Sequence, residues 1–278
     1  MSKITAAAIQ LNSQPDLDQN LEQAANAIQK AVEQNAVLVA LPENFAFLGN
    51  EKEKQNQAEN ISSAVESYIP NWAKKHGIYI LAGGYPVRAK SGKVYNRAVV
   101  VAPGGEMIAT YDKIHLFDVA INDEETYRES DTVEAGKPEP VVCDLRFEQP
   151  DQQEKLNLNL GLSICYDLRF SELYRSLANL GADIITVHSA FTRPTGEAHW
   201  EVLLRARAIE NSCYIIAPAQ TGRHGEKRKT HGHSMIIDPW GTVLADAGKE
   251  PGMAISEIET GSLQEVRRKL PSLKHRVL

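Results

Sequence analysis

Cys165 is the residue with the clearest chemical potential in this chain. It follows the apolar run 160–164 and precedes residues 171–178, whose apolar positions have helical spacing. A thiol at a turn from strand to helix lies near the electropositive start of the helix, which favours the thiolate and nucleophilic attack. A free cysteine by itself is more often a buried core residue. The prediction of a nucleophile therefore depends on partner groups elsewhere in the chain.

Glu43 and Lys113 are two side chains that could assist such a nucleophile. Glu43 follows the apolar run 37–41, and beyond the carboxyl end of a strand in an α/β sheet it would face the ligand crevice. Partial desolvation there would raise its pKa towards that of a general base. Lys113 has apolar and aromatic neighbours, and its ammonium could stabilise an oxyanion. The ordinary alternatives are a surface or helix-capping acid and a lysine at a strand edge.

Other chemistries receive little support from the sequence. A Cys–His pair is disfavoured because no papain-like or caspase-like signature surrounds the thiol. The candidate histidines for such a pair are His115, His188, His199, His231 and His233. The last two resemble a metal-binding fragment, yet no third ligand has motif spacing. A glycine-rich phosphate loop is also absent from the sequence. We therefore expect no metal, nucleotide or flavin cofactor.

Composition narrows the class of protein. The 278 residues are 42% hydrophobic and 24% charged, which is typical of a globular protein. The 30 Lys and Arg against 36 Asp and Glu give a net charge of −6, which argues against nucleic acid as a general partner. No run approaches the ~18 apolar residues of a membrane span, and residues 1–10 resemble a first strand more than a signal peptide. Three scattered cysteines are too few for a disulfide framework, so we expect a cytoplasmic protein.

Strand-like and helix-like segments alternate along the chain. Apolar runs predict strands over 4–10, 37–41, 78–82, 183–188 and 214–217, and helical spacing predicts helices over 17–32, 62–75, 171–178 and 200–208. The charged segments 51–60 and 149–155 are expected to be solvated loops, although the first could form part of an active-site rim.

Two segments repeat one pattern, which is an apolar strand, a Pro-x-Gly turn and a second apolar strand. They are residues 99–109 and 235–245. Such a hairpin in each half predicts a pseudo-symmetric α/β sandwich in which residues 1–278 form a single domain. Two unrelated hairpins are the alternative.

Three separated segments resemble the signature segments of the nitrilase superfamily of carbon–nitrogen hydrolases: residues 42–44, 111–116 and 161–167. The resemblance extends over nearly the whole chain and implies that Glu43, Lys113 and Cys165 form a catalytic triad. It implies a further glutamate near the thiol, which maps to Glu129 or to its neighbours at 124 and 125.

The resemblance also implies architecture and assembly. The expected fold is a four-layer α-β-β-α sandwich. A homodimer or larger homo-oligomer is expected to form through the helices after Cys165 and around Trp200. Residues 262–278 resemble a C-terminal extension that reaches across a dimer, with a frayed terminus as the alternative.

Details of the motifs point towards an amidase. Residues 165–167 resemble the amidase branches more than true nitrilases, and residues 190–200 resemble the branch that includes deaminated glutathione amidase and omega-amidase, closest to the former. The implied reaction hydrolyses a small carboxylate-bearing amide to acid and ammonia through a thioester. The candidates for substrate binding are Tyr166, Arg169, Phe191, Thr192 and Arg193. The two arginines could hold a carboxylate of the substrate, or they could form structural ion pairs instead.

Several alternative functions stay open from the sequence alone. Within the family they are an omega-amidase acting on α-ketoglutaramate, an N-carbamoyl amino acid hydrolase and a nitrilase. Outside enzymology they are a redox-sensing cysteine protein and a binding protein on the same scaffold.

Overall fold

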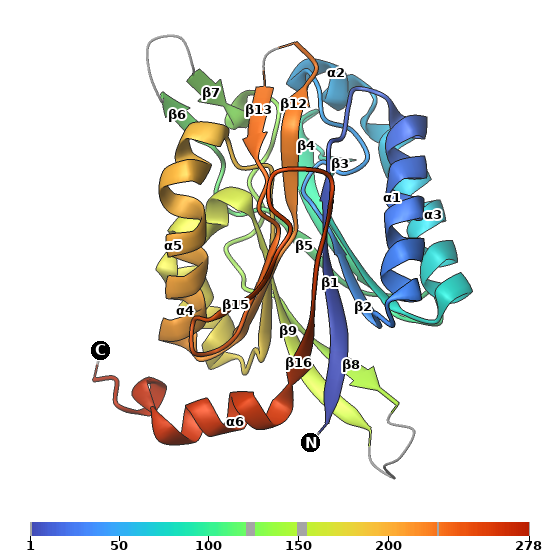
Figure 1. Cartoon of the computed structure of the whole chain (residues 1–278). Coiled ribbons are helices and arrows are strands. Elements are labelled where there is room, and N and C mark those ends of the chain that lie inside the picture. Colours follow the sequence, from blue (N-terminus) through green and yellow to red (C-terminus); the bar gives the residue numbers. More distant parts are fainter. Residues whose placement is uncertain (1, 121–125, 149–154, 227, 278) are drawn as a thin grey trace.

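The computed structural model describes residues 2–120, 126–148, 155–226 and 228–277 (Figure 1). Its first sheet has the strand order β13–β12–β1–β2–β3–β4–β5, and β16 also pairs with β1. The strands are β1 (Lys3–Leu11), β2 (Leu38–Leu41), β3 (Tyr79–Arg88), β4 (Val94–Val101), β5 (Met107–Asp112), β12 (Ala219–His224), β13 (Arg228–His231) and β16 (Gly252–Glu259).

The second sheet has the order β15–β14–β11–β10–β9–β8. Its strands are β8 (Val142–Phe147), β9 (Leu156–Ile164), β10 (Ile184–His188), β11 (Tyr214–Ala217), β14 (Met235–Ile237) and β15 (Val243–Asp246). A small separate hairpin joins β6 (Asp118–Ala120) to β7 (Thr126–Arg128). The two predicted hairpins are confirmed as β4–β5 in the first sheet and β14–β15 in the second, so the pseudo-symmetric pattern is present.

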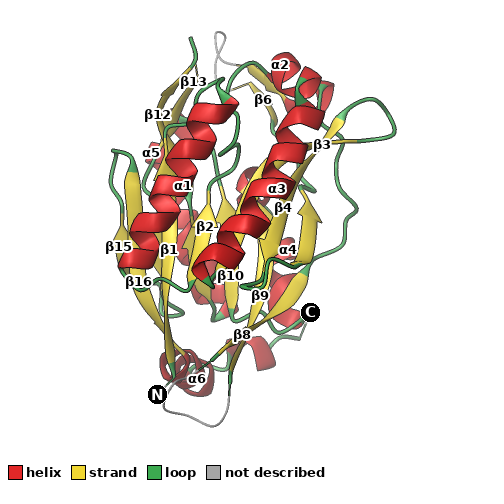
Figure 2. Cartoon of the chain, turned by 90° about the vertical axis from the view of Figure 1, so that its right-hand side faces the viewer, coloured by secondary structure: helices red, strands yellow, loops and turns green. Residues whose placement is uncertain are grey.

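Helices cover the outer face of each sheet. Figure 2 shows α1 (Leu17–Glu33) and α3 (Ala58–His76) side by side on the first sheet, and Figure 1 shows α4 (Ser171–Asn179) and α5 (Arg193–Asn211) on the second. The layers are therefore helix, sheet, sheet and helix, as the resemblance implied. Two short helices lie at opposite ends of the molecule, α2 (Glu51–Asn56) and α6 (Thr260–Lys269).

Burial on both faces explains why the central strands are almost continuously apolar. In β2, Leu38 and Ala40 belong to the core between the sheets, whereas Val39 and Leu41 pack under α1 and α3. Successive side chains of a strand point to opposite faces, so both sets must be apolar when both faces are covered. The strand runs predicted from the sequence follow from this constraint.

The segment 51–60 differs from its predicted loop conformation. It forms α2 and the start of α3, because the Asn50 side chain accepts hydrogen bonds from the N–H groups of Lys52 and Glu53 and so caps the helix. The second predicted loop, 149–155, lies outside the described residues except for its last position.

The predicted C-terminal extension begins inside α6. Leu263 is buried, and the Arg267 guanidinium binds the Asp183 carboxylate at 2.7 Å and the Ser212 carbonyl at 3.0 Å. This part of the extension is therefore held against its own chain. Within the described residues, no helix has both the length and the apolar character needed to cross a membrane.

Gly83 in β3 faces His188 of the second sheet so closely that a methyl group there would overlap the imidazole ring. We expect Gly83→Ala to lower the free energy of unfolding by about 1–3 kcal/mol, because the two packed sheets must shift to admit the extra carbon. Urea unfolding checks this, with Gly252→Ala as control since its nearest neighbouring atom lies 3.9 Å away. Equal stability of both variants would contradict the close approach of the sheets.

Candidate active site

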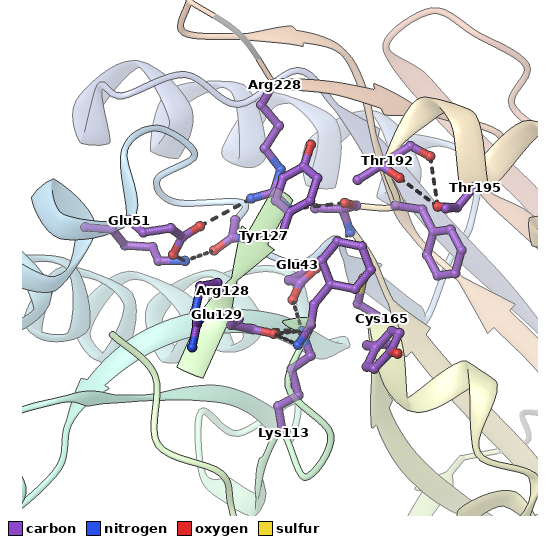
Figure 3. Close-up of a pocket in the computed structure, with 16 residues that line it drawn as sticks. Glu43, Glu51, Lys113, Tyr127, Arg128, Glu129, Cys165, Thr192, Thr195 and Arg228 are labelled. Carbon is purple, nitrogen blue, oxygen red and sulfur yellow. Dashed lines mark hydrogen bonds and ion pairs between the residues drawn. The ribbon is translucent and has the colours of Figure 1, made fainter. Parts of the chain in front are cut away.

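Glu43, Lys113 and Cys165 come together at one end of the two sheets (Figure 3). Glu43 lies two residues beyond β2, Lys113 directly follows β5, and Cys165 directly follows β9. The first two strands belong to the first sheet and β9 to the second. The site is therefore built where the two sheets face each other, and all three side chains are buried.

The Glu43 carboxylate makes contacts to both sheets. Its Oε1 atom accepts hydrogen bonds from Lys113 Nζ at 3.1 Å and from Asn96 Nδ2 at 2.8 Å. Its Oε2 atom accepts one from the Ala190 N–H at 2.9 Å, beyond the end of β10. Burial alone would raise the pKa of Glu43, but Lys113, Arg228 and the hydrogen bonds outweigh it and hold the pKa at about 2. Glu43 is thus a carboxylate, and its pKa is lowered rather than raised as the sequence suggested.

Lys113 is held between two carboxylates. Its Nζ lies 2.8 and 3.0 Å from the oxygens of Glu129, in addition to its contact with Glu43. Burial lowers the pKa of the ammonium, but the charges of Glu129 and Glu43 outweigh it and raise the pKa well above its usual value. Glu129 is fixed in turn by the Phe117 N–H at 2.7 Å. Glu124 and Glu125, the alternatives to Glu129, lie outside the described residues.

Cys165 occupies a strained turn between β9 and the 3-10 helix η2 (Cys165–Arg169). Its φ of 49° is uncommon for a residue with a side chain. The buried Asp167 carboxylate stabilises this turn, accepting hydrogen bonds from the Ile164 N–H at 2.9 Å and from the Tyr111 hydroxyl at 2.7 Å. Because Tyr111 belongs to β5, the same carboxylate ties the turn of Cys165 to the strand that positions Lys113.

The thiol of Cys165 is protonated in the resting site. Burial raises its pKa, and the charge of Glu43 and a hydrogen bond to it raise it further, whereas Lys113 lowers it. The sequence favoured a thiolate because of a helix start, but one short 3-10 turn does not compensate the loss of solvent. The geometry therefore pairs a neutral thiol with an ionised base.

Three of the five predicted substrate-binding residues line the pocket next to the thiol, namely Tyr166, Phe191 and Thr192. Arg169 lies at its edge, with its guanidinium carbon 5.7 Å from the Tyr166 ring centroid and 5.5 Å from that of Phe191. The structure does not bring Arg193 to the pocket. It is exposed at the start of α5 and pairs with Glu197 at 2.9 Å, which corrects the sequence-based assignment.

Sequence reasoning missed several polar residues of the site. Asn96 occupies a buried position of β4 between Val94 and Ala98 on the same face, and a polar residue in that alternation is a signal that could have found it. Glu51 and Lys54 line the pocket from α2, in agreement with the alternative that segment 51–60 forms a rim. Arg228 reaches the pocket from β13, and nothing in its local sequence indicates that placement.

The histidines have structural contacts in this region. His188 Nδ1 lies 2.7 Å from the Leu41 carbonyl, and burial lowers the pKa of His188 to about 4. His115 Nδ1 lies 2.7 Å from the Asp167 carboxylate. In the part of the chain that the structure describes, no group of three His, Cys, Asp or Glu side chains is placed to hold a metal ion.

The profile of the carbon-nitrogen hydrolase family matches residues 5–268. The chain belongs to this family. It is 54% identical to the deaminated glutathione amidase of Synechocystis over 100% of this chain and 99% of that protein. The solved NitFhit protein of C. elegans is 37% identical with a TM-score of 0.88, covering 100% of this chain and 66% of that one.

A more distant hydrolase is relevant to the thiol. A mutant of the amidase from Nesterenkonia sp. AN1, solved with acrylamide added at its active-site cysteine, is 26% identical with a TM-score of 0.77, covering 96% of this chain and 98% of that one. The family assignment and these similarities support an amidase activity for this carbon–nitrogen hydrolase.

Replacing Glu43 should make the thiol easier to ionise. In Glu43→Gln the negative charge that raises the pKa of Cys165 is gone while Lys113 remains, so the pKa of the thiol should fall by about 1–3 units. Alkylation of Cys165 by iodoacetamide, followed against pH by peptide mass spectrometry, should therefore reach half its maximal rate at lower pH than in wild type. A shift towards higher pH would contradict the assigned charges.

Proposed function

We propose that this carbon–nitrogen hydrolase is a cysteine-dependent amidase of a small carboxylate-bearing amide, with deaminated glutathione as the substrate. The observation that carries the proposal is the convergence of Glu43, Lys113 and Cys165 in one buried pocket. The similarity to deaminated glutathione amidases supports the choice of substrate. The amide carbonyl would be attacked by the sulfur of Cys165.

The first half of the reaction forms a thioester. The Glu43 carboxylate accepts the proton of Cys165 as the sulfur attacks the carbonyl carbon and the carbonyl oxygen becomes an oxyanion. Lys113 and the backbone N–H of Tyr166 donate hydrogen bonds to this oxygen, and such a donor is worth about 10²–10³ in rate. The carbon–nitrogen bond then breaks, and Glu43 passes its proton to the departing nitrogen. Glu129 keeps the Lys113 ammonium in position throughout.

The second half returns the thiol. Water gives a proton to Glu43 and attacks the thioester carbon, and the carbon–sulfur bond breaks as Cys165 regains a proton. The nitrogen-containing product differs from the ammonia expected from the sequence. The amide nitrogen of deaminated glutathione belongs to cysteinylglycine, so the product beside the acid is an amine, whereas a primary amide releases ammonia.

Arg169 is a candidate to hold the carboxylate of the acyl part of the substrate. Its guanidinium stacks against Tyr166 and Phe191, which both line the pocket. A planar guanidinium held by two rings is suited to bidentate binding of a carboxylate. Thr192 and Phe191 would complete this side of the pocket.

Cys165→Ala should abolish hydrolysis of deaminated glutathione, because no thioester can then form. The measurement is the release of cysteinylglycine by purified protein. Hydrolysis of α-ketoglutaramate, an N-carbamoyl amino acid and an aliphatic nitrile is measured in parallel for comparison. Cys143→Ala is the matched control, since this half-buried cysteine lies outside the pocket, and it should keep wild-type activity. Hydrolysis by Cys165→Ala would refute the mechanism, and preference for another substrate would refute the assigned amide.

We also propose that the protein forms a homodimer in a reducing compartment such as the cytoplasm. Large apolar side chains are exposed on and near the helices that cover the second sheet, with Val202 68% and Ile209 45% exposed on α5 and Leu180 55% exposed after α4. Burying such a surface against a second copy would stabilise association. The three cysteines are free thiols, which suits a reducing environment.

A charge on that helical surface should break the dimer. Val202→Glu on α5 would place a carboxylate in the apolar contact, and sedimentation velocity should then give a monomer where wild type gives a dimer. Met107→Glu is the control, because Met107 is 42% exposed on β5, away from α4 and α5. A wild-type monomer, or a Val202→Glu dimer, would contradict this assembly.

A further inference from the structure

Glu51, Lys54 and Arg228 form a charged cluster on the wall of the active-site pocket, here named the Glu51 cluster. The Glu51 carboxylate lies 2.7 Å from Lys54 Nζ and 3.3 Å from Arg228 Nη1. Two cations thus share one anion, and the cluster has an excess of one positive charge. Lys54 is almost completely buried, and the Arg228 side chain is 20% exposed.

The described residues that line the pocket, taken together, also have an excess of one positive charge. Four cationic side chains and three carboxylates line it, and the thiol of Cys165 is neutral. Glu43 and Glu129 share the one ammonium of Lys113, so these three side chains carry one net negative charge, which Arg128 offsets from a position that is 71% exposed. Placing positive charge where a ligand binds favours an anionic ligand. The excess lies on the side of the Glu51 cluster.

Arg228 also has hydrogen-bonding capacity to spare. A guanidinium has five N–H donors, and Arg228 uses Nη1 for Glu51 and Nη2 for the Ala190 carbonyl, each at 3.3 Å. Its buried Nε finds no acceptor among the described residues. The guanidinium carbon lies over the Tyr127 ring, 5.9 Å from its centroid. A buried donor without an acceptor is costly, and a carboxylate is the ligand that its fork geometry fits.

The position of Arg228 indicates which part of a substrate it would meet. The backbone of Ala190 lies between Arg228 and the base, because its N–H donates to Glu43 and its carbonyl accepts from Arg228. Figure 3 shows Arg228 and Lys113 on opposite sides of Glu43. Lys113 faces the carbonyl oxygen in the proposed mechanism, and Glu43 must reach the departing nitrogen. Arg228 therefore lies beyond the leaving group.

We infer that Arg228, together with Lys54, binds a carboxylate carried by the leaving amine and so selects amides of carboxylate-bearing amines. This inference rests on the proposed amidase function. In deaminated glutathione the carboxylate is that of the glycine of cysteinylglycine. α-Ketoglutaramate has the same acyl group, but it releases ammonia and has no such carboxylate.

The two amides with one acyl group provide the test. In Arg228→Gln, kcat/KM for deaminated glutathione should fall by about ten- to hundredfold, mainly through a higher KM, because a hydrogen-bonded charge pair is lost. The value for α-ketoglutaramate at neutral pH should change little, since Glu43 stays ionised. Arg223→Gln removes the same charge from an exposed position of the same hairpin and should leave both values unchanged.

A modified substrate tests the same contact without depending on the variant's fold. When the glycine carboxylate of deaminated glutathione is converted to an amide, kcat/KM of wild type should fall by a similar factor. Arg228→Gln should hydrolyse this modified substrate no more slowly than wild type does. The role of Arg228 would be overturned if Arg228→Gln lowered kcat/KM equally for deaminated glutathione and for α-ketoglutaramate. Full activity of wild type on the modified substrate would overturn it as well. If wild type hydrolysed neither deaminated glutathione nor α-ketoglutaramate, the proposed function itself would be refuted.

Discussion

The Glu43 carboxylate is the interaction on which the site depends. One oxygen is bound by Lys113 and Asn96 from the first sheet, and the other by the Ala190 N–H from the second. Neither sheet alone supplies both sets of donors. Both oxygens of the base are therefore held in place only when the two sheets are packed in one register. The core between them, which includes Leu38, Ala40 and Leu162, sets that register.

Burying three charged groups would be unfavourable if any of them were unmatched. Here Lys113 has two carboxylates, and each carboxylate has further N–H donors, so the charges are paired and hydrogen-bonded. A network of this kind is rigid, and it holds the ammonium where the substrate oxygen acquires charge. It also explains why the thiol stays neutral at rest. The proton leaves the sulfur towards a base that is already in place.

The sequence predicted the elements and the central residues of the site for different physical reasons. Strands buried on both faces and amphipathic helices leave local patterns, so the elements could be predicted from segments such as 37–41, whereas the four-layer arrangement followed from the resemblance to the nitrilase superfamily. Glu43, Lys113 and Cys165 could be identified because each follows a predicted strand or hairpin within a recognisable segment. Their convergence confirms the fold, while their catalytic roles stay predictions.

What the sequence could not supply depends on distant contacts. The low pKa of Glu43 comes from charges 70 and more residues away, so a local argument from desolvation gave the opposite direction. Arg193 and Arg228 are both arginines in polar surroundings, yet only Arg228 turns towards the pocket. Which of them does so is decided by the course of the β12–β13 hairpin.

The placement of the chain ends has a consequence for how such a hydrolase can be combined with other proteins. The pocket opens where α2, β7 and β13 gather, and the start of β1 together with α6 lies at the far end of the molecule (Figure 1). A second protein joined to either terminus would thus begin remote from the entrance and leave the route of incoming molecules clear. Gene fusion at either end is compatible with this geometry.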